Sequence, residues 1–255
     1  MRDPHVEKLH YRIGSGTDSL SFVDPEPQSF ENILGRFDIT DGQAAAWPAE
    51  HFASEQDART AIEPFFRAWE ISADLKSDPG PIKFTFDHAD VIDRNPLPPG
   101  SAAVFTAVGT GEVLFVGATP RVQITSPRYP APPSDFRTTT EVEVAYRRWL
   151  GYREGKEPLQ SMAYFVYTLV TGAAGGKKGA TKMYGIQEDV LGKLSELSST
   201  RGDGSDARKA GAVAALTGAE RNWLEQVVKR IVLRLGEHAS GGPVTPLSKQ
   251  DLPQI

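Results

Sequence analysis

The spacing of apolar residues changes at a proline-rich segment, residues 127–134, which reads Pro-Arg-Tyr-Pro-Ala-Pro-Pro-Ser. Proline has no backbone N–H to donate, so this segment can continue neither a helix nor a central strand. Before it, short apolar runs between turn residues are typical of strands; after it, apolar residues recur every three to four positions, as in helices. The sequence predicts an α+β chain, with a β-containing N-terminal domain followed by an all-helical C-terminal bundle of about five helices. The expected divisions are an acidic β-rich domain with one amphipathic helix at 1–130, a linker at 131–137, a basic helical bundle at 138–240 and a flexible tail at 241–255.

Several runs in the first part have the composition of strands. Residues 82–86 alternate apolar and polar side chains, and Gly109-Thr110-Gly111 between two apolar runs favours a hairpin. One helix should begin after Ser54, a suitable N-cap, and Pro64 inside it predicts a kink or a break. Strands are expected at 9–13, 19–23, 82–86, 102–108, 112–116 and 122–125.

Capping patterns mark the helices of the second part. Thr140 with Glu143, and Thr217 with Glu220, fit the capping box, and Pro158 suits a first helical turn. The run after Pro158 is apolar on almost every side, which predicts a helix at the centre of the bundle. Helices are expected at 140–150, 158–170, 186–197, 206–215 and 217–235.

Composition and motifs exclude several classes of chemistry. The 255 residues contain no cysteine, so disulfides, thiolate metal sites and cysteine nucleophiles are ruled out. The glycine-rich residues 172–180 lack the spacing of a phosphate-binding loop and predict a mobile connection between helices. No apolar run has the length of a signal peptide or of a membrane span, so we expect a cytoplasmic protein without a membrane partner.

The densest group of metal-capable side chains is Asp87, His88, Asp90 and Asp93. On a regular strand His88 and Asp90 share a face while Asp87 points the other way, so a third ligand must come from elsewhere. The favoured interpretation is a solvated strand end, with no metal and no cofactor.

Charge divides the chain unevenly. Residues 1–136 carry 11 Lys and Arg against 20 Asp and Glu, whereas residues 137–240 carry 16 against 12. Arg230, Arg234 and His238 are spaced four positions apart on the last expected helix, with Glu237 beside them. This spacing places them on one side of the helix and predicts a surface that binds an anion or a partner. The helical second part is similar in architecture to HEPN-class ribonucleases, but Arg234 is separated from His238 by only three residues, fewer than in their arginine–histidine motif, and no other arginine stands at the right distance, so no catalytic residue is assigned.

These observations favour a non-enzymatic binding or adaptor protein that acts through protein–protein contacts. The alternative is a nucleic-acid-binding or RNA-processing protein that uses the basic C-terminal helical domain. The expected partner is another protein, with nucleic acid as the alternative, and self-association into a homo-oligomer stays open.

Overall fold

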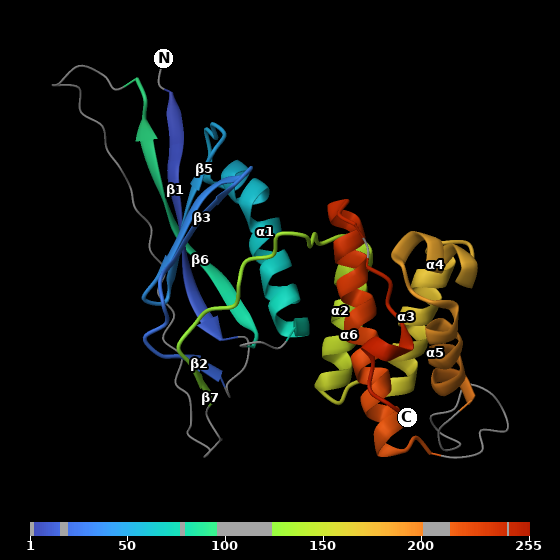
Figure 1. Cartoon of the computed structure of the whole chain (residues 1–255). Coiled ribbons are helices and arrows are strands. Elements are labelled where there is room, and N and C mark those ends of the chain that lie inside the picture. The colour runs from blue at the N-terminus through green and yellow to red at the C-terminus, as the bar shows by residue number, and fades with distance from the viewer. Residues whose placement is uncertain (1–2, 16–19, 77–79, 96–123, 201–214, 244) are drawn as a thin grey trace. The chain divides into compact units, whose positions relative to one another are not determined.

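The computed structural model describes residues 3–15, 20–76, 80–95, 124–200, 215–243 and 245–255 (Figure 1). An antiparallel sheet region is followed by helices, as the α+β prediction requires. The chain forms two compact units, residues 1–66 with 79–130 and residues 67–78 with 131–255. The boundary between the units falls within one helix, α1 (Glu55–Lys76).

The first unit is built on a sheet whose five described strands lie in the order β3-β4-β5-β1-β6, with every neighbouring pair antiparallel. Asp41 and Gly42 form the two-residue turn between β4 and β5, and both have positive φ, as a type I′ hairpin turn requires. A separate pair, β2 (Leu20–Phe22) and β7 (Ile124–Ser126), is parallel. The sheet strands are β1 (Pro4–Ser15), β3 (Gln28–Asn32), β4 (Gly35–Thr40), β5 (Gln43–Pro48) and β6 (Ile82–Asp93).

Three of the expected strands, at 9–13, 19–23 and 82–86, are confirmed as β1, β2 and β6. The run at 122–125 overlaps β7, and the hairpin expected at 102–116 lies outside the described residues. Strands β3, β4 and β5 were not expected from the sequence.

The first half of α1 covers one face of this sheet. Phe66 contacts the rings of Tyr11, Phe37 and Phe84, which point to that face from β1, β4 and β6. Alternate residues of the same strands, such as His10 and Arg36, point to the opposite face, which is polar. The sheet therefore has one apolar face and one face lined with charged and imidazole side chains.

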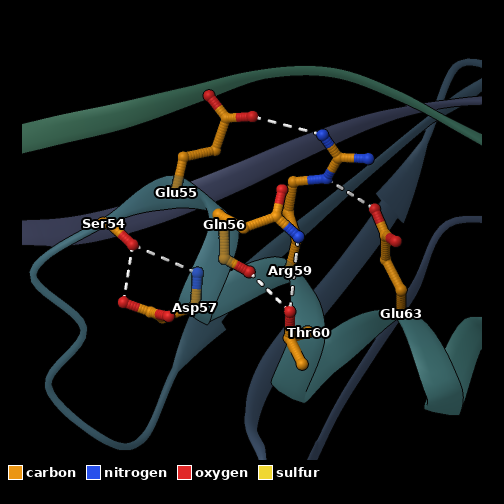
Figure 2. Close-up of polar contacts among 7 residues, drawn as sticks. All are labelled: Ser54, Glu55, Gln56, Asp57, Arg59, Thr60 and Glu63. Atoms are coloured by element: carbon orange, nitrogen blue, oxygen red, sulfur yellow. Dashed lines mark hydrogen bonds and ion pairs between the residues drawn. The ribbon is translucent and has the colours of Figure 1, made fainter.

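The start of α1 is fixed by local polar contacts (Figure 2). Ser54 Oγ accepts a hydrogen bond from the Asp57 backbone N–H at 3.2 Å, which confirms Ser54 as the N-cap. Arg59 forms ion pairs with Glu55 at 3.2 Å and Glu63 at 2.6 Å, one helical turn away on either side. The helix continues through Pro64 to Lys76, so of the expected kink or break the break does not occur, and a kink stays a prediction.

Among its described residues the second unit contains five α-helices and one short 3₁₀ helix, η1 (Lys249–Asp251), besides the end of α1. Helix α3 contacts α2, α4, α5 and α6, which confirms the central place predicted for the apolar run after Pro158. The capping box of Thr217 and Glu220 is confirmed, whereas α2 is capped by Thr139 and not by Thr140. The helix expected at 206–215 lies outside the described residues. The helices are α2 (Thr140–Arg153), α3 (Leu159–Ala173), α4 (Lys177–Tyr184), α5 (Glu188–Thr200) and α6 (Gly218–Ser240).

Two segments differ from the expectation of mobile chain. Residues 172–180 are not a loop throughout, because α4 begins at Lys177. The C-terminal residues pack against the bundle. Leu247 and Leu252 are buried in its core, and Leu247 forms an isolated β-bridge with Ile186. The polar composition of residues 241–255 led to the prediction of a flexible tail, although the segment contains these two leucines.

Candidate functional site

The connection from α3 to α4 is tight and depends on glycine. Gly175 and Gly176 have φ values of 72° and 116°, which side chains other than glycine rarely adopt. A Cβ atom at Gly179 would lie 1.8 Å from the Ala174 carbonyl oxygen, so only glycine allows the chain to pass here. The glycine-rich sequence at 172–180 therefore brings the start of α4 close to the end of α3.

This turn places α4, which carries three lysines, next to Tyr167 of α3. Lys177, Lys178 and Lys182 lie on α4, and the Lys177 Nζ atom is 5.8 Å from the centre of the Tyr167 ring on α3. The Tyr167 ring is in turn 6.1 Å from that of Tyr164. We call these five residues the α3–α4 surface.

No carboxylate balances these lysines within the part of the chain that the structure describes. Residues 158–187 contain no Asp or Glu at all, and none of the ion pairs between described residues involves Lys177, Lys178 or Lys182. The α3–α4 surface therefore carries a positive charge that its own neighbours do not neutralise.

Several other cations of the second unit form ion pairs. Arg67 binds Glu143 at 2.7 Å, and Arg153 binds Asp74 at 2.5 Å. Arg148 binds Glu157 at 2.9 Å. These ion pairs link elements of the unit, whereas none of the ion pairs between described residues involves a lysine of α4.

The predicted flank on α6 is more nearly neutral. Arg234 forms an ion pair with Glu237 at 2.5 Å, and its side chain is only 17% exposed. The pKa of Asp251 is lowered, first by hydrogen bonds from Ser248 and further by the positive charges of Arg230 and Arg234. The exposed His238 stacks edge-on against Tyr184, with ring centres 5.0 Å apart. A binding role for Arg230, Arg234 and His238 stays a prediction.

The acidic and imidazole residues of β6 lie in the first unit. His88 and Asp90 share the polar face of the sheet with His10 of β1, and one ligand atom from each residue lies within 4.8 Å of the others. Asp87 also points to this face, against the expectation, because its carboxylate contacts both His88 and Arg12. Asp93 is separate from this group and accepts hydrogen bonds from the backbone N–H groups of Asp3 and Asn95.

Two parts of these sites were missed from the sequence. The lysines of α4 were assigned to a loop, although 30 consecutive residues without a carboxylate were a visible signal. His10 stands 78 positions before His88, and only the pairing of β1 with β6 brings the two together.

Comparison with known proteins adds no relationship: no family model, no curated protein and no solved structure matches this chain. Within the described ranges, every helix is too short or too polar to cross a lipid bilayer.

Proposed function

We propose that this protein binds nucleic acid through the α3–α4 surface. One observation carries the proposal: Lys177 of α4 lies over the Tyr167 ring, Lys178 and Lys182 lie on the same helix, and no ion pair between described residues involves these three lysines. Phosphate groups supply the negative charge that this surface lacks, and the release of their counterions drives binding.

The tyrosines favour single strands over duplexes. An unpaired base exposes its flat face and can stack on an aromatic ring, which contributes about 1–3 kcal/mol per base. In a duplex the bases are already stacked on each other. Lysines on flexible stems contact phosphates without reading bases, so binding should depend little on sequence.

Fluorescence anisotropy with a labelled single-stranded oligonucleotide tests the proposal on the full chain. Three phosphate contacts predict a slope of about −2 for log K against log salt concentration. Replacing Lys177, Lys178 and Lys182 together by Ala should weaken binding about tenfold at low salt and flatten this slope. Alanine is the best helix former, so the substitutions should leave α4 intact.

The matched control removes three lysines elsewhere. Lys83, Lys156 and Lys249 are exposed, and their joint replacement by Ala lowers the net charge by the same amount. This control should bind almost as the native protein does. Equal losses in the two variants would mean that net charge alone causes binding, and the α3–α4 surface would have no special role.

A protein partner is the second candidate, favoured by apolar side chains on β6. The Val91 and Ile92 side chains are 48% and 41% exposed, and both lie on β6, an edge strand of the described sheet. If this strand holds a protein, Val91→Ser with Ile92→Ser should release it, while Ile33→Ser should not, although Ile33 is more exposed. A cross-linked partner retained equally by all variants would count against this surface.

A further inference from the structure

The pairing of β1 with β6 is irregular at the point where the two strands carry histidine. His10 lies opposite His88, but the next pair is Tyr11 opposite Phe86, so Asp87 has no partner on β1. An extra residue of this kind is a β-bulge, and it interrupts the strict alternation of side chains. The bulge explains why Asp87 and His88, although adjacent in sequence, both turn to the polar face.

The polar face of the sheet thereby collects three side chains with metal-binding atoms. His10 Nε2 and Asp90 Oδ2 are 2.9 Å apart, and the His10 and His88 rings stack with their centres 4.1 Å apart. Two ligands on one tetrahedral zinc ion, each at about 2.0 Å, lie about 3.3 Å from each other. The three ligand atoms already lie within 4.8 Å of one another, and the two stacked imidazoles must tilt apart to reach a common ion.

A second carboxylate orients one of the imidazoles. Asp87 Oδ2 lies 2.8 Å from His88 Nδ1, and Arg12 holds the other oxygen of Asp87 at 3.3 Å. A carboxylate paired with a guanidinium accepts hydrogen bonds and donates none. Nδ1 of His88 must then carry the hydrogen, which leaves Nε2 with a free lone pair. Metal-binding histidines in proteins are commonly oriented by a carboxylate in this way.

We propose that His10, His88 and Asp90 bind one divalent transition-metal ion of the zinc class, with a fourth coordination position open to solvent. Two imidazoles and one carboxylate suit zinc and its neighbours in the first transition series, whereas Mg²⁺ and Ca²⁺ require oxygen ligands. Asp87 is a positioning residue and does not touch the ion.

Nearby cations limit the affinity of the site. Lys8 Nζ is 3.8 Å from Asp90, and Arg12 contacts Asp87, so two positive charges face the two carboxylates. An incoming ion competes with Lys8 for Asp90. Removal of this charge by Lys8→Met should tighten metal binding.

Titration of the tag-free full chain with ZnCl₂ in a calorimeter tests the proposal. We expect one ion per chain in the native protein, and no binding at this site in His88→Ala or in Asp90→Asn. Asp87→Asn keeps all three ligands and should weaken binding by about 10-fold to 100-fold. Addition of Mg²⁺ in excess should leave the zinc affinity unchanged.

The matched control uses the other imidazole pair of the sheet. His51 stacks on His5, with ring centres 5.0 Å apart, and His5 lies on β1 five positions before His10. His51→Ala should bind zinc as the native protein does. Full binding by His88→Ala, or loss of binding in His51→Ala alone, would overturn the proposal.

Visible absorption after loading with Co²⁺ reports metal coordination directly, and a folding defect does not produce the same signal. Cobalt in a low-symmetry site of nitrogen and oxygen ligands gives absorption bands that the free hydrated ion lacks. These bands should be present in the native protein and in His51→Ala, and should change shape in Asp87→Asn. Far-UV circular dichroism of each variant verifies the fold, and a spectrum of free cobalt in the folded native protein would refute the site.

Discussion

Asp74 is buried in the second unit, and the guanidinium of Arg153 lies 2.5 Å from its carboxylate. Asp74 lies in the last part of α1 and Arg153 at the end of α2, so this ion pair connects two helices through residues that are 79 positions apart in the sequence. Tyr146 donates a second hydrogen bond to Asp74 at 2.9 Å. A buried carboxylate with two donors is stable only while both donors remain.

Arg153→Met should therefore destabilise the protein by about 2 kcal/mol, because the buried Asp74 carboxylate loses its ion pair with Arg153. Urea unfolding followed by circular dichroism measures the change. Combining Asp74→Asn with Arg153→Met should restore part of the loss, since no unpaired charge remains. Lys156→Met serves as the control: its pair with Glu154 is exposed, and its loss should change stability by less than about 0.5 kcal/mol.

Trp223 of α6 is 2% exposed and belongs to the core that the bundle helices share. Trp223→Ala should cost about 3–5 kcal/mol, through lost burial and the cavity that the ring leaves. The midpoint of chemical unfolding gives the value. A cost below about 1 kcal/mol would mean that the ring contributes little to the core.

The helices were predictable because their signals are local. The apolar stripe of α6 and its capping box stand within one segment, and each turn repeats the same pattern. Strand β5 reads Gln-Ala-Ala-Ala-Trp-Pro, and alanine has no preference for strands, so this element was missed. The turn Asp41-Gly42 was the signal that identifies it.

The sites were less predictable than the helices, since they depend on pairing across the sequence. Nothing near His88 indicates that His10 lies opposite it, and a single bulge decides the direction in which Asp87 points. The sequence shows that α4 carries lysines. Whether a carboxylate forms an ion pair with them depends on which carboxylates of other elements lie near α4, and here those carboxylates pair with other cations.

Acid should destabilise the first unit through His5, which is buried beside His51 on the sheet. Burial lowers the pKa of His5 below 6.5, and the charges of Arg94 and His51 lower it further, against weaker opposing effects of Asp3 and Glu7. The folded state therefore binds fewer protons than the unfolded state, so stability falls as the pH drops from about 6.5 toward the folded pKa. His5→Gln should reduce this loss between about pH 7 and pH 5, measured by thermal unfolding. An equal pH dependence in the variant would assign the effect to other groups.

The C-terminal residues should contribute to stability, because Leu247 and Leu252 belong to the core of the bundle. Leu247→Ala should cost about 2–4 kcal/mol, as expected for a buried leucine. Lys249→Ala in the same segment should change stability little, since its pair with Asp189 is exposed. Hydrogen exchange of the Leu247 backbone N–H, which donates to the Gly185 carbonyl oxygen at 2.8 Å, tests the same packing without a mutation. Rapid exchange in the native protein would show that the segment is detached in solution.

Cleavage of the chain at Asp135 tests whether the helical unit depends on α1. Ser134 and Asp135 are exposed and lie outside the described helices and strands, so a protease that cuts before aspartate can reach residue 135. The fragment from residue 135 onward retains α2 to α6 but loses Ala68, Ile71 and Leu75, which α1 contributes to the same core.

A separately expressed fragment of residues 135–255 should therefore keep its helical signal and unfold at a lower urea concentration than the second unit of the intact chain. Adding a synthetic peptide of residues 67–78 should raise that midpoint, because it supplies the missing apolar side chains and the carboxylate of Asp74 for Arg153. A fragment as stable as the unit in the intact chain, and indifferent to the peptide, would mean that α1 adds nothing to the bundle.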